Sequence, residues 1–151
     1  MNKIPPNDPD EAAKAKPIDP YQARRERWIR PLNGSYDRLR AWVNMIFMDH
    51  AFFRMAYLNL HSVSPKVWRA AQPLPYQIHR MARRGVKTVL TLRGGQSFGS
   101  YPLEVEACDR ARIKFEKLEF RSRALPSVAE LEAAEALFAN LEYPVMMHCK
   151  S

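Results

Sequence analysis

Residues 86–92 read Val-Lys-Thr-Val-Leu-Thr-Leu, and Arg93-Gly94-Gly95 follows them directly. Most side chains in this run are β-branched, and the run has the length of a buried strand. The two glycines end the strand in a loop. This stretch therefore predicts a buried strand, and the pattern on either side of it predicts the kind of sheet.

Strands and helices alternate on both sides of this run. The other expected elements are a strand at 66–70 (KVWRA), a helix at 73–85, a helix at 102–108 and an irregular strand at 113–120. Prolines stand in the first turn of both helices, and Gly85 stands at the end of the first one. Such an order predicts an α/β fold with a mostly parallel central sheet flanked by helices on both faces.

The clearest helix signal begins at Ser127. Ser127 and Glu130 have the spacing of a capping box, in which each side chain accepts a hydrogen bond from the backbone N–H of the other residue. Apolar side chains then recur every three or four residues, and we expect this stripe to face the core: Val128, Leu131, Ala134, Phe138 and Leu141. The helix ends before residues 145–147 (VMM), which predict the last strand.

The N-terminal part of the chain has a different character. Residues 1–19 are rich in proline and polar side chains, so we expect a disordered tail. Residues 20–62 predict a helical extension, and residues 63–151 predict the main domain.

Within this extension, residues 36–60 form the longest periodic segment, which we interpret as a mostly buried helix. A membrane-surface or partner-binding helix is the alternative, because Arg38, Arg40 and Arg54 flank an apolar face rich in Met and Phe. Asp49-His50 interrupts the apolar run. Arg54 has the spacing either to share a face with His50 or to pair with Asp49, and we interpret these residues as a structural polar cluster.

Composition restricts the class of protein. The two cysteines, Cys108 and Cys149, have no metal-ligand or disulfide-framework spacing. No stretch approaches the roughly 18 uncharged apolar residues that a membrane span needs, and the N-terminus holds no apolar signal segment. We therefore expect a soluble cytoplasmic protein without a cofactor.

The net charge of +8 is unevenly distributed. Residues 61–100 hold no Asp or Glu but seven basic residues, namely Lys66, Arg69, Arg80, Arg83, Arg84, Lys87 and Arg93. A face of this kind favours phosphorylated substrates, anionic lipid headgroups or nucleic acid. A basic solvated face without a specific ligand is the alternative.

Cys149 follows the last predicted strand and His148. In parallel sheets, ligands bind beyond the carboxyl ends of the strands, which is where this pair lies. A loop that turns its backbone N–H groups inward there would bind a phosphate and stabilise a thiolate. From these two residues alone, a buried structural cysteine remains the alternative.

Residues 143–151 (YPVMMHCKS) are similar to the strand and phosphate-binding loop of the protein tyrosine and dual-specificity phosphatases, a cysteine-dependent superfamily. The signature of that loop reads His-Cys-x-x-Gly-x-x-Arg. The segments VWRAAQP, VKTVLTLRG and SRALPSVAELEAA precede it in the order seen in bacterial members. The resemblance covers roughly residues 66–151 and implies a phosphotyrosine phosphatase-like fold.

The resemblance implies that Cys149 attacks phosphorus and forms a phosphocysteine intermediate, which water hydrolyses. His148 would order the loop and help to keep the thiolate. Lys150 and Ser151 would contribute to the phosphate cradle. The signature Arg would fall beyond Ser151, so we expect a chain that is incomplete within its loop and has negligible turnover as given.

The same resemblance leaves the general acid unassigned. Many relatives carry an Asp about thirty residues before the Cys, but residues 120–127 hold no Asp or Glu. Arg121 and Arg123 in that loop are candidates for binding the substrate anion, with solvated arginines as the alternative. Arg93, at the same sheet edge, is a further candidate.

These expectations favour a phosphomonoester hydrolase that acts on a phosphorylated protein or on a phosphorylated lipid or inositol. The enzyme would need no metal, and we expect no nucleic-acid partner. Peripheral membrane contact through the basic face is a further expectation. A non-catalytic phosphate- or phosphoinositide-binding domain is the first alternative, because the signature Arg is absent from the given chain. A rhodanese-like sulfur transferase is the second, since that family also presents a Cys in an anion-binding loop.

Overall fold

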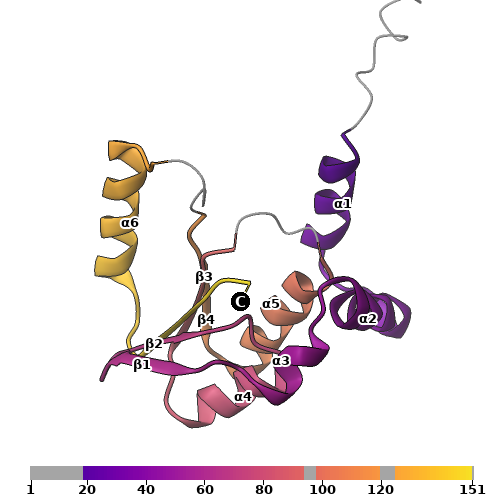
Figure 1. Cartoon of the computed structure of the whole chain (residues 1–151), viewed down its shortest axis with the longest axis horizontal. Coiled ribbons are helices and arrows are strands. Elements are labelled where there is room, and N and C mark those ends of the chain that lie inside the picture. The colour runs from indigo at the N-terminus through magenta and orange to yellow at the C-terminus, as the bar shows by residue number, and fades with distance from the viewer. Residues whose placement is uncertain (1–18, 94–97, 120–124, 151) are drawn as a thin grey trace, which may run out of the picture.

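A computed structural model of the chain describes residues 19–93, 98–119 and 125–150 (Figure 1). The helical elements are α1 (Pro20–Ile29), α2 (Gly34–Val43), the π-helical segment η2 (Asn44–Met48), α3 (Phe52–Ala56), α4 (Pro75–Arg83), α5 (Ser100–Ala111) and α6 (Val128–Asn140). The strands are β1 (His61–Ser64), β2 (Val67–Ala70), β3 (Thr88–Thr91), β4 (Lys114–Lys117) and β5 (Val145–His148).

The five strands form one sheet in the order β1-β2-β5-β3-β4. Strand β5 pairs in parallel with β2 on one side and with β3 on the other, and β3 pairs in parallel with β4. The short β1 runs antiparallel to β2 at the edge. The expected mostly parallel sheet is confirmed, and its last strand in sequence lies in its middle.

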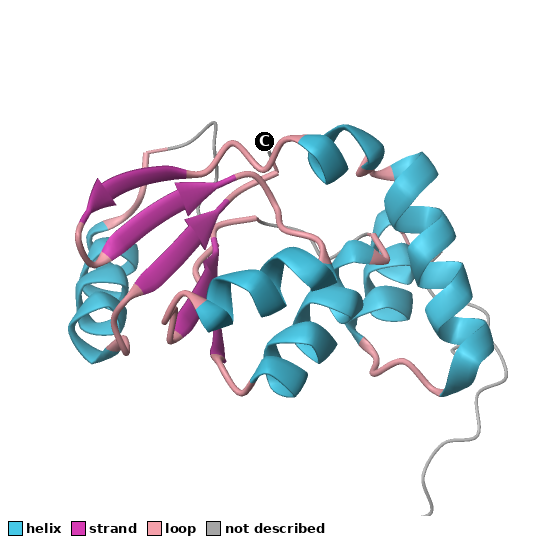
Figure 2. Cartoon of the chain, turned by 90° about the horizontal axis from the view of Figure 1, so that it is seen from below, coloured by secondary structure: helices cyan, strands magenta, loops and turns pink. Residues whose placement is uncertain are grey.

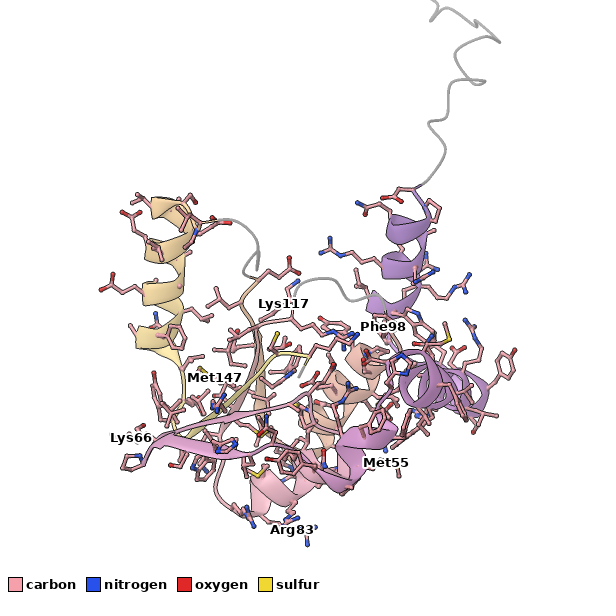
Figure 3. All side chains as sticks on the ribbon, in the orientation of Figure 1. Met55, Lys66, Arg83, Phe98, Lys117 and Met147 are labelled. Atoms are coloured by element: carbon pink, nitrogen blue, oxygen red, sulfur yellow. The ribbon has the colours of Figure 1, made fainter. Side chains whose placement is uncertain are left out.

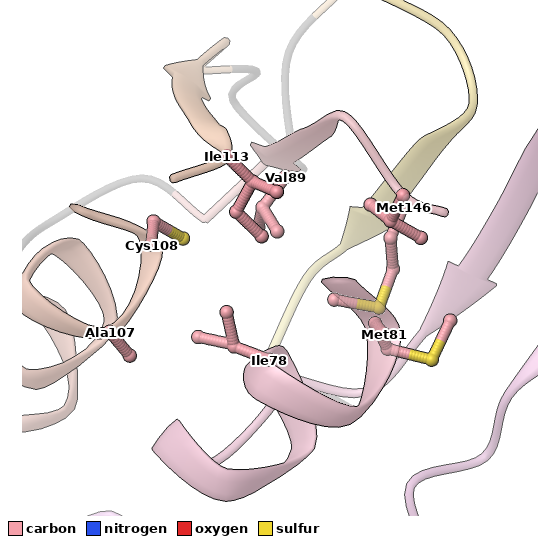
Figure 4. Packing of buried hydrophobic residues seen from close by; sticks show 8 residues of the cluster. Ile78, Met81, Val89, Ala107, Cys108, Ile113 and Met146 are labelled. Atoms are coloured by element: carbon pink, nitrogen blue, oxygen red, sulfur yellow. The ribbon is translucent and has the colours of Figure 1, made fainter. Parts of the chain in front are cut away.

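Neighbouring residues of the central strands face opposite layers, as the two-residue period of a strand requires. Val89 and Met146 pack with α4 and α5, in a cluster that includes Ile78 and Cys108 (Figure 4). On the other face, Leu90 packs with α6 and the segment that follows it. Figure 2 shows these helices on the two sides of the sheet. Helices therefore cover both faces, as the alternation of elements predicted.

The N-terminal helices pack on α5 and not on the sheet. Trp28 of α1, Ala41 of α2 and Met45 of η2 form a buried cluster with Leu103 of α5. Gly99, at the start of α5, donates its backbone N–H to the Asn44 side-chain oxygen at 2.7 Å. This cluster joins the helical extension to the main domain.

The expectation of one mostly buried helix at 36–60 is wrong. The segment divides into α2, η2 and α3, and His50, between η2 and α3, has a positive φ of 53°. Many of its apolar side chains are exposed, including Leu39 at 62% and Phe47 at 67%. Asp49 is instead fully buried, and its ion pairs described below fix the break in the helix.

The expectation for the apolar stripe of α6 is only partly met. The capping box is present, with the Glu130 backbone N–H donating to Ser127 Oγ and the Ser127 N–H donating to Glu130 Oε2. However, Val128 is 72% exposed and Leu131 is 51% exposed. Leu137 and Phe138, in the later turns of α6, pack in the cluster around Leu90. Figure 1 shows α6 as a helix that stands out from the sheet.

We expect Gly99→Ala to destabilise the protein, because a Cβ atom at this position would lie 2.4 Å from the Ala41 carbonyl oxygen. Overpacking of this kind costs about 1–3 kcal/mol of unfolding free energy. Urea denaturation of the variant and the wild type measures this loss of unfolding free energy. Ala139→Ser, at an exposed site of α6, is the control, and equal stability of the two variants would show that α2 does not pack here as described.

Candidate active site at the carboxyl edge of the sheet

The candidate residues meet where the parallel strands end. His148 is the last residue of β5, and its register partners are Ala70 of β2 and Thr91 of β3. Cys149 and Lys150 follow His148, while Gln72 and Arg93 follow β2 and β3. The structure thus brings together His148, Cys149, Lys150 and Arg93, as predicted from the order of the strands.

The two cysteines have opposite environments. Cys149 is exposed, whereas Cys108 is buried in the core between α5 and the sheet. Burial, together with the nearby Glu104 carboxylate, raises the pKa of the Cys108 thiol. The thiolate is the reactive form of cysteine, so Cys149 is the one accessible nucleophile of the pair.

His148 is held by two contacts. Its Nδ1 lies 3.1 Å from the Cys149 carbonyl oxygen, and because a carbonyl only accepts, this bond requires a proton on Nδ1. Its Nε2 lies 2.5 Å from Glu104 Oε1. Both side chains are buried. These two contacts therefore hold the imidazole between α5 and the backbone of Cys149.

Glu104 was not identified from the sequence. It lies on α5 between Leu103 and Ala107, on the face of the helix that is buried. A carboxylate on the buried face of a helix needs a partner, because an unpaired buried charge is strongly unfavourable. An acid within the apolar pattern of residues 100–108 was therefore the available signal.

A second buried carboxylate, Asp49, organises the other side of the site. Arg93 donates two hydrogen bonds to it, from Nη1 to Oδ2 at 2.8 Å and from Nη2 to Oδ1 at 2.7 Å. Arg54 donates to Oδ2 at 2.9 Å, and the Ser100 hydroxyl donates to the same oxygen at 2.9 Å. This confirms one of the two pairings considered for Arg54, and it connects three elements at one carboxylate.

The pKa of Asp49 is lower than that of an ordinary Asp. Burial alone would raise it, but the hydrogen bonds and charges of Arg93, with Ser100 and Arg54, outweigh that effect. Asp49 is therefore a carboxylate at neutral pH. It has no proton to give to a leaving group, so it does not fill the place of the unassigned general acid.

Gln72 joins the two carboxylates. Its Nε2 donates to Glu104 Oε2 at 3.0 Å, and its Oε1 accepts from Arg93 Nη1. Hydrogen bonds thus run from Asp49 through Arg93 and Gln72 to Glu104, and the contact between Glu104 Oε1 and His148 Nε2 continues this network to the end of β5. Each hydrogen bond in it satisfies a group that is costly to bury unpaired.

Arg93 was expected to bind phosphate. Its guanidinium is only slightly exposed, it is paired to Asp49, and it stacks 4.9 Å from the centre of the Phe98 ring. These contacts fix its position at the edge of the site, and binding of phosphate by Arg93 stays a prediction. Lys150 is half exposed, with Nζ 4.0 Å from Asp49 Oδ1 and 5.6 Å from the Phe98 ring centre. Lys150 is therefore the more accessible cation.

A hollow of about 330 Å³ lies beside Lys150. Its other walls come from Ala71 and from the α3 region, including Phe53 and Tyr57. The N-terminal helices therefore supply walls of a hollow beside Lys150, the residue after Cys149.

Other expected site residues are not placed here. Ser151, Arg121 and Arg123 lie outside the described residues. Most of the basic block is exposed and lies away from the site, as Figure 3 shows for Lys66 and Arg83 relative to Phe98.

Within residues 19–93, 98–119 and 125–150, no three His, Cys, Asp or Glu side chains could hold a metal ion. None of the helices in these ranges is long and apolar enough to cross a membrane.

Comparisons with known proteins support the fold. No protein-family model matches the sequence, and no curated protein does. Among solved structures, the chain is similar to a proposed phosphatase from Neisseria meningitidis, with 19% identity and a TM-score of 0.50 over 60% of this chain and 66% of that one. It is also similar to a proposed phosphatase from Shewanella putrefaciens CN-32, with 20% identity and a TM-score of 0.52 over 66% of each chain.

A third similar structure is the core catalytic domain of the PP-IP phosphatase SIW14 from S. cerevisiae in complex with citrate. The identity is 22% and the TM-score 0.50, over 60% of this chain and 55% of that domain. The chain therefore spans 55–66% of the length of these structures. The expected α/β fold of the tyrosine phosphatase type is confirmed.

We expect Cys149 to react with iodoacetamide in the native protein and Cys108 to remain unmodified, because burial hides the Cys108 thiol and raises its pKa. Peptide mass mapping after brief labelling measures both sites. Cys149→Ser should abolish native labelling, and Cys108→Ser should leave it unchanged. Rapid modification of Cys108 without denaturant would contradict the described core.

We expect Asp49→Asn to cost about 3–5 kcal/mol of unfolding free energy at neutral pH, because it leaves buried arginines without their charge partner. The folded-state pKa of Asp49 lies below the ordinary 3.8. The carboxylate therefore contributes fully above that value, and its contribution is lost as the pH falls through the folded-state pKa.

The stability gap between wild type and Asp49→Asn should consequently narrow below about pH 4. Urea denaturation at a series of pH values measures the gap, with Asp109→Asn at an exposed position as the control. A gap that is absent at neutral pH, or that widens in acid, would show that Asp49 is not held as an ionised partner.

Proposed function

We propose that the full-length protein hydrolyses phosphomonoesters through a phosphocysteine intermediate on Cys149. One observation carries the proposal: an exposed cysteine follows the central parallel strand and its backbone is supported by the buried His148–Glu104 pair. This arrangement presents a sulfur nucleophile at the edge of the sheet where ligands bind. The shared fold of phosphatases supports it.

In the proposed reaction, the Cys149 thiolate attacks phosphorus, the S–P bond forms and the ester P–O bond breaks. The leaving oxygen takes a proton from solvent. A water molecule then attacks phosphorus, the S–P bond breaks and the water returns a proton to solvent, which releases orthophosphate and the thiolate. Arg54, Arg93 and Lys150 lie around the Asp49 carboxylate, and Glu104 is the other acid of the network, so three cations against two carboxylates give the edge an excess of positive charge. This excess favours a dianionic phosphoryl group.

The positive charge at the carboxyl edge of the sheet supports a phosphorylated substrate. We propose a phosphorylated protein, of the tyrosine or dual-specificity type, or a phosphorylated lipid or inositol. The similar yeast domain is named as a PP-IP phosphatase, which supports inclusion of phosphorylated inositols. Because the chemistry needs a free thiol on Cys149, we place the protein in the reducing cytoplasm. Most of the basic block lies away from Cys149 and gives no support to a polyanionic substrate.

We expect the full-length protein to hydrolyse p-nitrophenyl phosphate, and Cys149→Ser to reduce the rate by about 10³-fold or more, as loss of a nucleophile does. Cys108→Ser, at the buried cysteine, is the matched control for loss of a thiol. Parallel assays with a phosphotyrosine peptide, a phosphoinositide and an inositol polyphosphate identify the substrate class. Acid-stable trapping of phosphate on Cys149 tests the intermediate.

The alternative is a non-catalytic phosphate- or phosphoinositide-binding domain. Vanadate or orthophosphate binding without any turnover in the full-length protein would support that alternative and overturn the proposed hydrolysis. Unchanged turnover in Cys149→Ser would overturn the role of the cysteine.

A further inference from the structure

The outer surface of α2, η2 and α3 is unusually apolar. We call this surface the apolar face, and it consists of Tyr36, Leu39, Val43, Phe47, Met48, Phe52, Phe53 and Met55. Each of these side chains is at least 45% exposed, and Tyr36, Phe47 and Phe53 are about two thirds exposed or more. Large exposed apolar side chains that gather on neighbouring helices are typical of an interaction site.

The helical spacing explains why four of these side chains share one side of α2 and η2. Tyr36, Leu39, Val43 and Phe47 recur at intervals of three or four residues. The opposite side is already used, because Ala41 and Met45 pack in the buried cluster with α1 and α5. The packing among the described residues therefore leaves the apolar face exposed.

Positive charge borders the apolar face. Arg40 lies 6.0 Å from the Tyr36 ring centre, and Arg27 of α1 and Arg30, the residue after α1, line the same hollow as Arg40. Glu26 and Asp37 are the acids in that hollow. Of the other two arginines expected to flank the face, Arg38 pairs with Glu106 and Arg54 with Asp49. The cations for an external partner are thus Arg27, Arg30 and Arg40.

We propose that the apolar face docks onto an anionic lipid bilayer, with α2 and η2 lying in the plane of the headgroups. Apolar and aromatic side chains on one side with arginines at the border are the features of helices that bind at this depth. The bordering arginines would contact acidic headgroups, which attract basic segments near the surface.

Charge argues for the bilayer over a second copy of the chain. In an isologous dimer, the same patch of both copies meets. Arg27, Arg30 and Arg40 outnumber the two acids of their hollow, Glu26 and Asp37, so two copies would bring surfaces of like net charge together, which is unfavourable. An acidic membrane surface complements these charges.

Docking would also orient the candidate site. Phe53 belongs to the apolar face and also lines the hollow beside Lys150. The edge of the sheet that carries Cys149 would therefore lie near the headgroups. This consequence does not depend on whether Cys149 hydrolyses phosphate.

The test is sedimentation of the full-length protein with vesicles of phosphatidylcholine alone and of phosphatidylcholine mixed with phosphatidylglycerol. We expect binding to the mixed vesicles that weakens with added salt. Leu39→Ser with Phe47→Ser should weaken it by about tenfold or more, since each side chain loses its apolar burial. Arg27→Gln with Arg30→Gln should reduce the preference for the acidic lipid.

The matched control is Val63→Ser with Val128→Ser, because these side chains are similarly exposed on β1 and α6. It should bind as the wild type does. Failure of the wild type to bind the mixed vesicles, or equal binding by the Leu39/Phe47 variant, would overturn the proposal. Analytical ultracentrifugation distinguishes the cause: a dimer that Phe47→Ser dissociates would assign the face to a second copy. Catalytic assays of the same variants without lipid keep this result separate from the proposed hydrolysis.

Discussion

The site depends on the buried carboxylate of Asp49. It receives two hydrogen bonds from Arg93 and one each from Arg54 and Ser100. These partners come from the loop after β3, from α3 and from the start of α5. A carboxylate without water around it is tolerated only when such donors surround it. Asp49 therefore determines how the N-terminal helices sit on the main domain and where Arg93 can lie.

The network continues from Arg93 to the backbone of Cys149. Gln72 connects Arg93 with Glu104, and Glu104 fixes the ring of His148, which in turn holds the Cys149 carbonyl. Polar groups in such a chain are satisfied only by each other, so moving one member leaves another unpaired. The backbone at Cys149 is consequently placed by residues from both the extension and the sheet domain.

Local pattern predicted most of the elements that carry the site. The β-branched run at 86–92, the capping box at Ser127 and the short strand before His148 all specify their structure through near neighbours in sequence. The helix break at Asp49 could not be predicted in this way, because the partner that fixes it, Arg93, is far away in sequence. The local pattern around Glu104 signals an acid on an apolar helix face, but it could not identify the partner, because His148 belongs to the last described strand. Local periodicity also indicated that most of the segment 36–60 is buried. Only one side of α2 and η2, with Ala41 and Met45, packs in the buried cluster with α1 and α5.

The position of β5 has a consequence for the order in which the protein is made. This strand follows the other four described strands in sequence, yet it fills the gap between β2 and β3. Until it is translated, both of those strands expose unpaired edges, which are prone to associate with other chains. Glu104 also lacks its imidazole partner during that interval. The nascent chain thus needs chaperone protection at these two edges until β5 has been made.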